Sequence, residues 1–126
     1  KCKSRIFFRV YSTIIQNIIR KHDPCIRYGG DEMLIIYPKV TEARVKTSVE
    51  RIRQQISGTP WDRIAQGLSV SASFGVAEFR ETETIDQWVH RADMAAYAAK
   101  DSGRNCVRTY SSMSQDEKKR AHRRGQ

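Results

Sequence analysis

The sequence predicts an α+β fold in which helices flank a mainly antiparallel sheet, and three observations lead to this prediction. Three segments carry apolar residues at the three- and four-residue spacing of a helix face. Other short segments are apolar, or alternate between apolar and polar residues, as strands do. Both kinds follow one another along 126 residues, a length typical of one domain with one core. No apolar run approaches the ~20 residues of a membrane-spanning helix.

The first expected elements are a helix and a β-hairpin. Residues 6–19 repeat a pair of apolar residues every four positions, which predicts an amphipathic helix that ends before the proline at position 24. Two short apolar runs, 25–28 and 33–37, then flank a Gly-Gly-Asp-Glu tetrapeptide. Strand-like runs around such a turn predict a β-hairpin.

A second helix and a longer strand are expected in the middle of the chain. Residues 41–57 have apolar residues at four-, three- and four-residue spacing, and Thr41 is a suitable N-cap. Residues 58–67 are typical of a loop. Residues 68–76 alternate between apolar side chains and serine or glycine, which predicts a half-buried strand.

A third helix and a last strand complete the expected domain. Thr84 and Gln87 fit a capping box, so we expect a helix to begin there, with an apolar face that starts at Ile85 and includes Trp88 and Val89. Gly103 is placed to end it. Residues 105–110 form a short strand in this interpretation, and residues 111–126 form a polar, basic tail.

The net charge of +9 is unevenly distributed. Residues 1–27 hold seven basic residues and one acidic residue, residues 114–126 hold five and two, and the region between them is neutral. A basic surface can attract nucleic acid, anionic lipid or a phosphorylated small molecule, or can simply be solvated. Three scattered cysteines favour neither a disulfide framework nor a structural zinc site, so we expect a reducing, cytoplasmic setting.

The hairpin tip carries the first candidate for chemistry. Gly29 and Gly30 allow positive φ and a close approach of a ligand. Asp31 and Glu32 follow directly, and adjacent residues on a strand point to opposite faces, so the two carboxylates cannot bind one ion in the same way. One of them could hold a hard cation such as Mg²⁺. The alternative is an ordinary surface turn, in which glycine and aspartate are common.

Three ordered segments resemble the GGDEF family, the diguanylate cyclases. They are Arg27-Tyr-Gly-Gly-Asp-Glu-Met33, Ser71-Ala-Ser-Phe-Gly-Val-Ala77 and the segment from Ala92 to Asn105. The resemblance covers about residues 5–110, so residues 1–110 are interpreted as a partial GGDEF domain. Met33 stands where the family usually has phenylalanine.

The resemblance implies a fold, an activity and a setting. The fold would resemble the palm of nucleotide cyclases and polymerases, with its first strand missing. The family condenses two GTP molecules into cyclic di-GMP in bacterial signalling, with Mg²⁺ or Mn²⁺ and as a homodimer. An N-terminal sensory domain is common, and no nucleic-acid partner is expected. The chain would then be cytoplasmic, or the cytoplasmic domain of a larger or membrane-bound protein.

The resemblance also implies roles for individual residues. Gly29 and Gly30 would bind the nucleotide, while Asp31 and Glu32 would bind metal and take part in catalysis. Lys100 and Arg104 would bind phosphate from one helix face, provided that the helix continues through position 103. The alternative for this pair is two cations that complement the dipole at a helix C-terminus.

Product inhibition has its own candidate residues in this interpretation. Arg20 and Asp23 form an RxxD motif with five residues between Asp23 and Gly29, which is the offset of the inhibitory site in the family that this sequence resembles. They would bind cyclic di-GMP, because an arginine fork and a carboxylate suit phosphate and guanine groups. Arg51 lies where the family often supplies another arginine.

Parts of the family pattern have no counterpart in this sequence, which begins with lysine rather than methionine. The family's first strand, with a metal-binding aspartate, is missing, as is the helix with a guanine-reading asparagine. Arg5 stands where the family has an aspartate. Three interpretations follow: the C-terminal part of an active cyclase, a degenerate domain that binds cyclic di-GMP, or a protein-interaction remnant. We expect this chain alone to be inactive.

Overall fold

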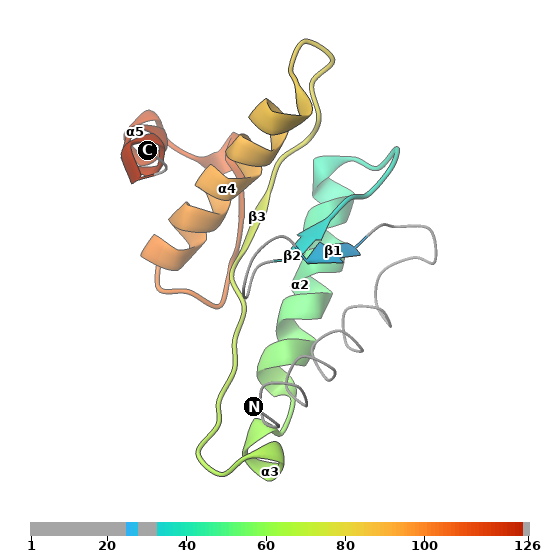
Figure 1. Ribbon diagram of the computed structural model, residues 1–126, viewed down its shortest axis with the longest axis vertical. Helices are drawn as coiled ribbons and strands as arrows, with labels where there is room; N and C mark the ends of the chain where they lie inside the picture. The colour runs from blue at the N-terminus through green and yellow to red at the C-terminus, as the bar shows by residue number, and fades with distance from the viewer. Residues whose placement is uncertain (1–24, 28–32, 125–126) are drawn as a thin grey trace.

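A computed structural model of the protein describes residues 25–27 and 33–124 (Figure 1). The elements in chain order are β1 (Cys25–Arg27), β2 (Met33–Ile35), α2 (Glu42–Gly58), α3 (Trp61–Ile64), β3 (Phe74–Val76), α4 (Ile85–Asp101), β4 (Val107–Thr109), the 3-10 helix η1 (Tyr110–Ser112) and α5 (Gln115–Arg124). The helix expected over residues 6–19 lies outside the described residues.

The described strands form two separate ladders of two strands each. β1 and β2 are antiparallel, with Arg27 opposite Met33, which confirms the predicted hairpin strands. β3 and β4 are parallel, with Phe74 opposite Val107. A mainly antiparallel sheet is therefore not confirmed. The parallel pair arises because α4 lies between its two strands in sequence, and parallel strands need such a long crossover connection.

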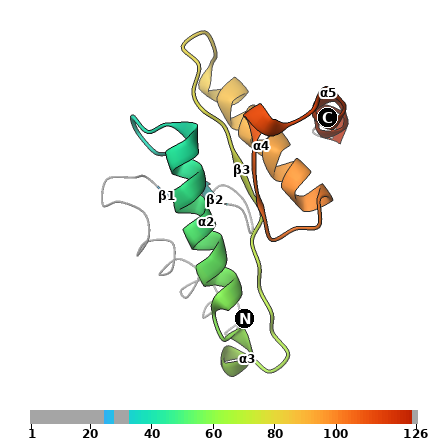
Figure 2. The same cartoon turned by 180° about the vertical axis from the view of Figure 1, so that it is seen from behind.

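The β3–β4 ladder is sandwiched between α2 and α4, as the two opposite views show (Figures 1 and 2). Successive strand residues point to opposite faces. Val76 packs with Val49 of α2 and with Val107. Gly75, its neighbour, lies against the backbone of α4. The two helices that carry candidate site residues are thus fixed to opposite sides of the same ladder.

The core beside α2 is built from large side chains. Ile52, Ile56 and Trp61 are buried together, and Met33 and Ile35 of the hairpin pack against them. The predicted loop over 58–67 is wrong in part, because it contains the short helix α3. The Trp61 indole N–H donates to the Ile56 carbonyl oxygen at 2.6 Å, which holds α3 against the end of α2.

The predicted strand over 68–76 is shorter in the structure, where only Phe74–Val76 joins a ladder. The preceding residues keep their role in packing: three partly buried side chains contact the cluster beside α2, namely Leu68, Val70 and Ala72. The alternation therefore reports which side chains face the core, and not which backbone groups are paired.

Helix α4 begins with the predicted capping box: Thr84 Oγ1 accepts from the Gln87 N–H and the Gln87 side chain accepts from the Thr84 N–H. The predicted apolar face is wrong at its start, because Ile85 is 68% exposed. Ile85 lies in the first turn of the helix, ahead of the residues that contact β3. The buried residues of α4 are three alanines, Ala95, Ala98 and Ala99, together with Arg91 and Met94.

The predicted polar tail is an ordered, packed segment up to residue 124. It forms η1 and α5, and two of its side chains, Met113 and Ala121, are buried against α4. Arg108 and Glu117 form an ion pair at 2.9 Å that ties α5 to β4. Hydrogen bonding to the Arg108 guanidinium lowers the pKa of Glu117 to about 2. The composition predicts a polar tail here because Ala121 is the only apolar residue of α5.

No helix in the described ranges, 25–27 and 33–124, has the length and apolar character needed to cross a membrane.

Candidate functional site

The hairpin residues with the strongest sequence signal lie outside the described residues. These are Gly29, Gly30, Asp31 and Glu32, and the same holds for Arg20 and Asp23. The structure does describe the strands on either side of the tetrapeptide, and it pairs Arg27 with Met33. The roles of the six residues stay predictions.

The helix α4 ends before Gly103, as predicted, so the condition under which Lys100 and Arg104 would share a helix face is not met. α4 ends at Asp101, and three successive residues have positive φ: Gly103 at 112°, Arg104 at 65° and Asn105 at 47°. The Arg104 N–H still donates to the Ala99 carbonyl oxygen at 3.1 Å. Lys100 and Arg104 therefore do not share a helix face, because the left-handed backbone turns the chain away from the helix axis after Gly103.

Both cations of this turn are exposed. Lys100 lies in the last turn of α4 and Arg104 in the left-handed turn just beyond it. Neither side chain makes a hydrogen bond or an ion pair with the part of the chain that the structure describes. Two exposed cations, four residues apart and without internal partners there, are free to contact an anionic ligand.

The turn itself is held by other elements. The Asn105 N–H donates to Ser73 Oγ at 3.1 Å, and the Arg53 guanidinium of α2 donates to Asn105 Oδ1 at 3.1 Å. The sequence analysis missed both Ser73 and Arg53 in this role. The two positions are 32 and 52 residues from Asn105, so no local pattern could have paired them.

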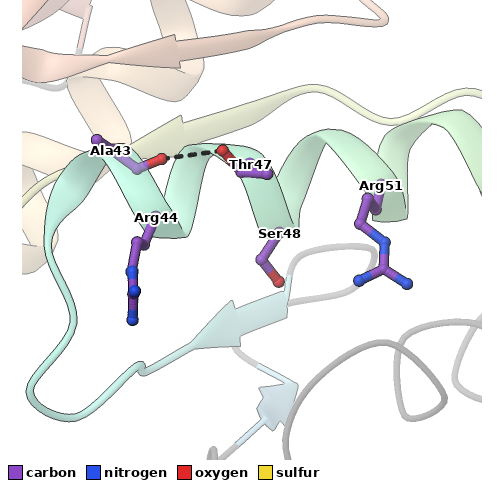
Figure 3. Close-up of a pocket in the computed structure, with 5 residues that line it drawn as sticks. All are labelled: Ala43, Arg44, Thr47, Ser48 and Arg51. Carbon is purple, nitrogen blue, oxygen red and sulfur yellow. Dashed lines mark hydrogen bonds between the residues drawn. The ribbon is translucent and has the colours of Figure 1, made fainter.

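Arg51 lies on a different face of α2, where it lines a depression of about 440 Å³ (Figure 3). Arg44, Ser48 and Arg51 point to the same side of the helix, toward β1 and β2. Ala43 and Thr47 complete the lining by described residues, which includes two cations and no acid. Arg44 was not predicted, although its spacing of seven residues from Arg51 places the two on one helix face.

A second surface depression lies between the start of α4 and α5. Arg91 donates to both carboxylate oxygens of Glu83 and to the Glu78 carbonyl oxygen, and this hydrogen bonding lowers the pKa of Glu83. His90 is half-buried, and its ring lies edge-on to the His122 ring, with 5.5 Å between the ring centroids. No group of three potential metal-binding side chains occurs among the residues described.

These features define an α+β domain with two separate groups of cations, one on α2 and one after α4. The family model "Diguanylate cyclase, GGDEF domain" matches residues 5–106, and the chain belongs to the GGDEF family. The three ordered segments of the sequence lie within that match or end at its border, so the resemblance is confirmed.

The relatives and solved structures agree with this assignment. Response regulator PleD of Caulobacter vibrioides is 38% identical over 103 residues, which are 79% of this chain and 22% of PleD. The GGDEF domain of DgcB from Caulobacter crescentus, solved in complex with c-di-GMP, is 30% identical with a TM-score of 0.75; the match covers 82% of this chain and 63% of that one.

A third similar protein is the active GGEEF domain of a diguanylate cyclase from Vibrio cholerae. It is 26% identical with a TM-score of 0.79, and the match covers 87% of this chain and 70% of that one. The family implies a divalent metal in general. The chain spans about a fifth of the length of PleD.

Proposed function

We propose that the protein carrying this chain is a diguanylate cyclase, which condenses two GTP molecules into cyclic di-GMP. The observation that carries this proposal is the match to the cyclase family over residues 5–106. The chain retains the Gly-Gly-Asp-Glu tetrapeptide at 29–32 within that match. Two exposed cations after α4 support a phosphate-binding role for a second part of the domain.

The hairpin supplies donors that fit a divalent metal. Asp31 and Glu32 offer carboxylate oxygens, the donors that hard cations such as Mg²⁺ or Mn²⁺ prefer. A bound metal would neutralise charge on the triphosphate and lower the pKa of the attacking 3′-hydroxyl. Gly29 and Gly30 would leave room for the nucleotide beside the backbone. The antiparallel pairing of β1 with β2 supports this arrangement, because it sets Arg27 opposite Met33, on either side of the tetrapeptide in sequence.

Lys100 and Arg104 would contact the outer phosphates of GTP. Charge-assisted hydrogen bonds from ammonium and guanidinium groups are the usual way to bind such oxygens. Each subunit would hold one GTP, so the reaction needs a homodimer in which the 3′-hydroxyl of one nucleotide reaches the α-phosphate of the other. In this proposal the described ladders are parts of a palm-like, largely antiparallel sheet.

Cyclic di-GMP would also bind away from the catalytic hairpin, at Arg20, Asp23 and Arg51. The depression beside Arg51 supports this, because its described lining includes two arginines and no acid, and the ligand carries two negative charges. Arg44 is a further candidate contact. That DgcB was solved with c-di-GMP shows that a related domain holds this ligand.

The protein's setting follows from the same proposal. A cyclase that uses GTP would act in the cytoplasm, where the nucleotide is made, either alone or as a domain of a larger or membrane-bound protein. A sensory domain would precede the cyclase domain and control it.

The test is a cyclic di-GMP assay on the protein in its natural length, with GTP and Mg²⁺. Asp31→Asn and Glu32→Gln should each lower turnover by about a hundredfold or more, because each removes charge next to the metal. Glu81→Gln, which changes an exposed acid elsewhere, should leave turnover unchanged. Unchanged turnover in both hairpin variants would contradict the assignment.

A binding measurement decides between a cyclase and a degenerate domain. Calorimetry with cyclic di-GMP should show binding that Arg20→Ala, Asp23→Ala and Arg51→Ala each weaken. Binding without any synthesis would favour the degenerate domain, for which the arginine at position 5 is the specific observation. Neither synthesis nor binding would leave the protein-interaction remnant.

A further inference from the structure

The turn that carries Arg104 is fixed through its neighbour, Asn105, from two other elements. The Arg53 guanidinium of α2 donates to Asn105 Oδ1 at 3.1 Å and to the Asn105 carbonyl oxygen at 3.5 Å. On the other side, the Asn105 N–H donates to Ser73 Oγ at 3.1 Å. The side chain and both backbone groups of Asn105 are therefore engaged.

This anchoring matters because the turn uses an unfavourable backbone conformation. Arg104 and Asn105 both have positive φ, at 65° and 47°. A residue with a Cβ pays a conformational cost there, which asparagine tolerates better than arginine does. Surrounding contacts must hold such a residue in place, and strained residues of this kind concentrate at functional sites. Within the described residues, the Arg104 N–H donates to the Ala99 carbonyl oxygen, and the next residue provides further restraint.

Arg53 is itself well placed to act as a fixed support. Its Nε donates to Glu50 Oε2 at 2.8 Å one turn earlier in α2, and its side chain is only 19% exposed. The carboxylate holds the guanidinium plane while a second nitrogen reaches Asn105. α2 is in turn anchored by the buried Ile52 next to Arg53.

We propose that Arg53 is a positioning residue for Arg104. It holds Asn105, and through Asn105 it holds the left-handed backbone that directs the Arg104 guanidinium toward the outer phosphates of GTP. This inference rests on the proposed phosphate role of Arg104. Arg53 acts through Asn105 and makes no contact with the nucleotide.

The experiment measures the binding of GTP and of GMP, each with Mg²⁺, to the protein in its natural length. Arg53→Ala should weaken GTP binding about tenfold, the size of one charge-assisted hydrogen bond, and change GMP binding less than twofold. Asn105→Gly should have the same effect, because glycine keeps the positive φ but lacks Oδ1. The double variant should be no weaker than either single variant, since both remove one interaction.

The decisive comparison is between Arg104→Ala and the double variant that also carries Arg53→Ala. If Arg53 acts through Arg104, adding Arg53→Ala to Arg104→Ala should cause no further loss of GTP binding. Lys46→Ala serves as the charge control, because it removes one exposed cation from the same helix. Arg53→Gln, which keeps a hydrogen-bond donor without the charge, should recover part of the GTP affinity.

Several results would overturn the proposal. A tenfold loss that persists in the Arg104→Ala background would show that Arg53 contacts the ligand or acts by another route. Equal losses of affinity for GTP and GMP would indicate general destabilisation. So would a loss of affinity accompanied by a lower urea concentration at the midpoint of unfolding. If Arg104→Ala weakens GTP binding and Arg53→Ala does not, only the positioning role is wrong. If Arg104→Ala has no effect, the proposed phosphate role is wrong and the positioning role fails with it.

Discussion

Helices α2 and α4 both pack on the β3–β4 ladder, but they do so in opposite ways. α2 contacts the ladder and its surroundings through large side chains, among them Val49, Ile52 and Ile56. α4 rests on Gly75 with alanines at its buried side, and a Cβ added at Gly75 would lie 2.1 Å from the Ala92 carbonyl oxygen. The interface with α2 depends on large side chains that fill its volume. The interface with α4 depends on the missing side chain of Gly75. Each should therefore be sensitive to the kind of substitution that the other tolerates.

Gly75→Ala should produce the largest effect. The new methyl would meet backbone atoms of α4 at 2.1 and 2.2 Å, and backbone cannot rotate away as a side chain can. We expect a loss of about 4 kcal/mol in the free energy of unfolding, at the upper end of overpacking costs. Urea denaturation followed by circular dichroism measures it.

Gly58→Ala is the matched control for this variant. Gly58 is the last residue of α2, has no heavy atom within 4 Å of an added Cβ, and lies in helical conformation. The substitution should be neutral or stabilise by up to about 1 kcal/mol. A comparable loss in both glycine variants would contradict the idea that α4 is seated directly on the strand.

Ile52→Ala tests the other interface and should produce the next largest effect. Ile52 is fully buried beside Ile56 and Trp61, so its truncation leaves a cavity. We expect a loss of about 3 kcal/mol in the same denaturation measurement. Ile64→Ala, at a position that is 37% exposed, should cost less than about 1 kcal/mol. Similar losses of stability in the two isoleucine variants would contradict the idea that the interface with α2 depends on its large buried side chains.

A smaller effect concerns the outer side of α4, where α5 is tied to β4 by Arg108 and Glu117. The pKa of Glu117 is about 2 in the folded chain, below its ordinary value of 4.5. A depressed folded pKa stabilises the fold above pH 4.5, and this contribution is lost as the pH falls from 4.5 toward 2. Solvent screening limits it to about 1 kcal/mol or less.

Denaturation at a series of pH values measures this contribution. The difference in stability between the natural chain and Glu117→Gln should be constant above pH 5 and should shrink below pH 4.5. Asp116→Asn, which changes the adjacent exposed acid, should show no such trend. A difference that stays the same down to pH 2.5 would rule out the ion pair as its source.

The sequence predicts where α2 and α4 begin, but not how β3 and β4 pair. α2 with its Thr41 cap and α4 with its Thr84 capping box were predictable, because caps and apolar spacing are local signals. The parallel pairing of β3 with β4 was not, since ladder direction depends on where α4 returns the chain. The cluster around Trp61 also includes Met33 and Ile35, which are distant in sequence, and α5 offers only one apolar residue, Ala121, as a sign of its packing.

For the candidate site, likewise, the sequence indicates which residues take part but not how they are arranged. Lys100, Arg104 and Arg51 could be selected from the family resemblance, and the structure places all three at the surface. Their geometry could not be predicted. A helix through Gly103 would have aligned Lys100 with Arg104, but Gly103 and the two residues after it adopt positive φ. Arg44 and Arg53 gain their significance only from the depression and from the bond to Asn105.

The close contact between α4 and the backbone at Gly75 affects how the helix can move. At Gly75 the helix lies directly against the strand backbone, so no side chain of Gly75 separates the two that could repack there. The 17 residues of α4 span about 25 Å at 1.5 Å per residue, from the capping box to the turn that carries Arg104. We therefore expect a displacement at one end of α4 to tilt the whole helix about its contact with Gly75, and so to reach the turn that carries Arg104.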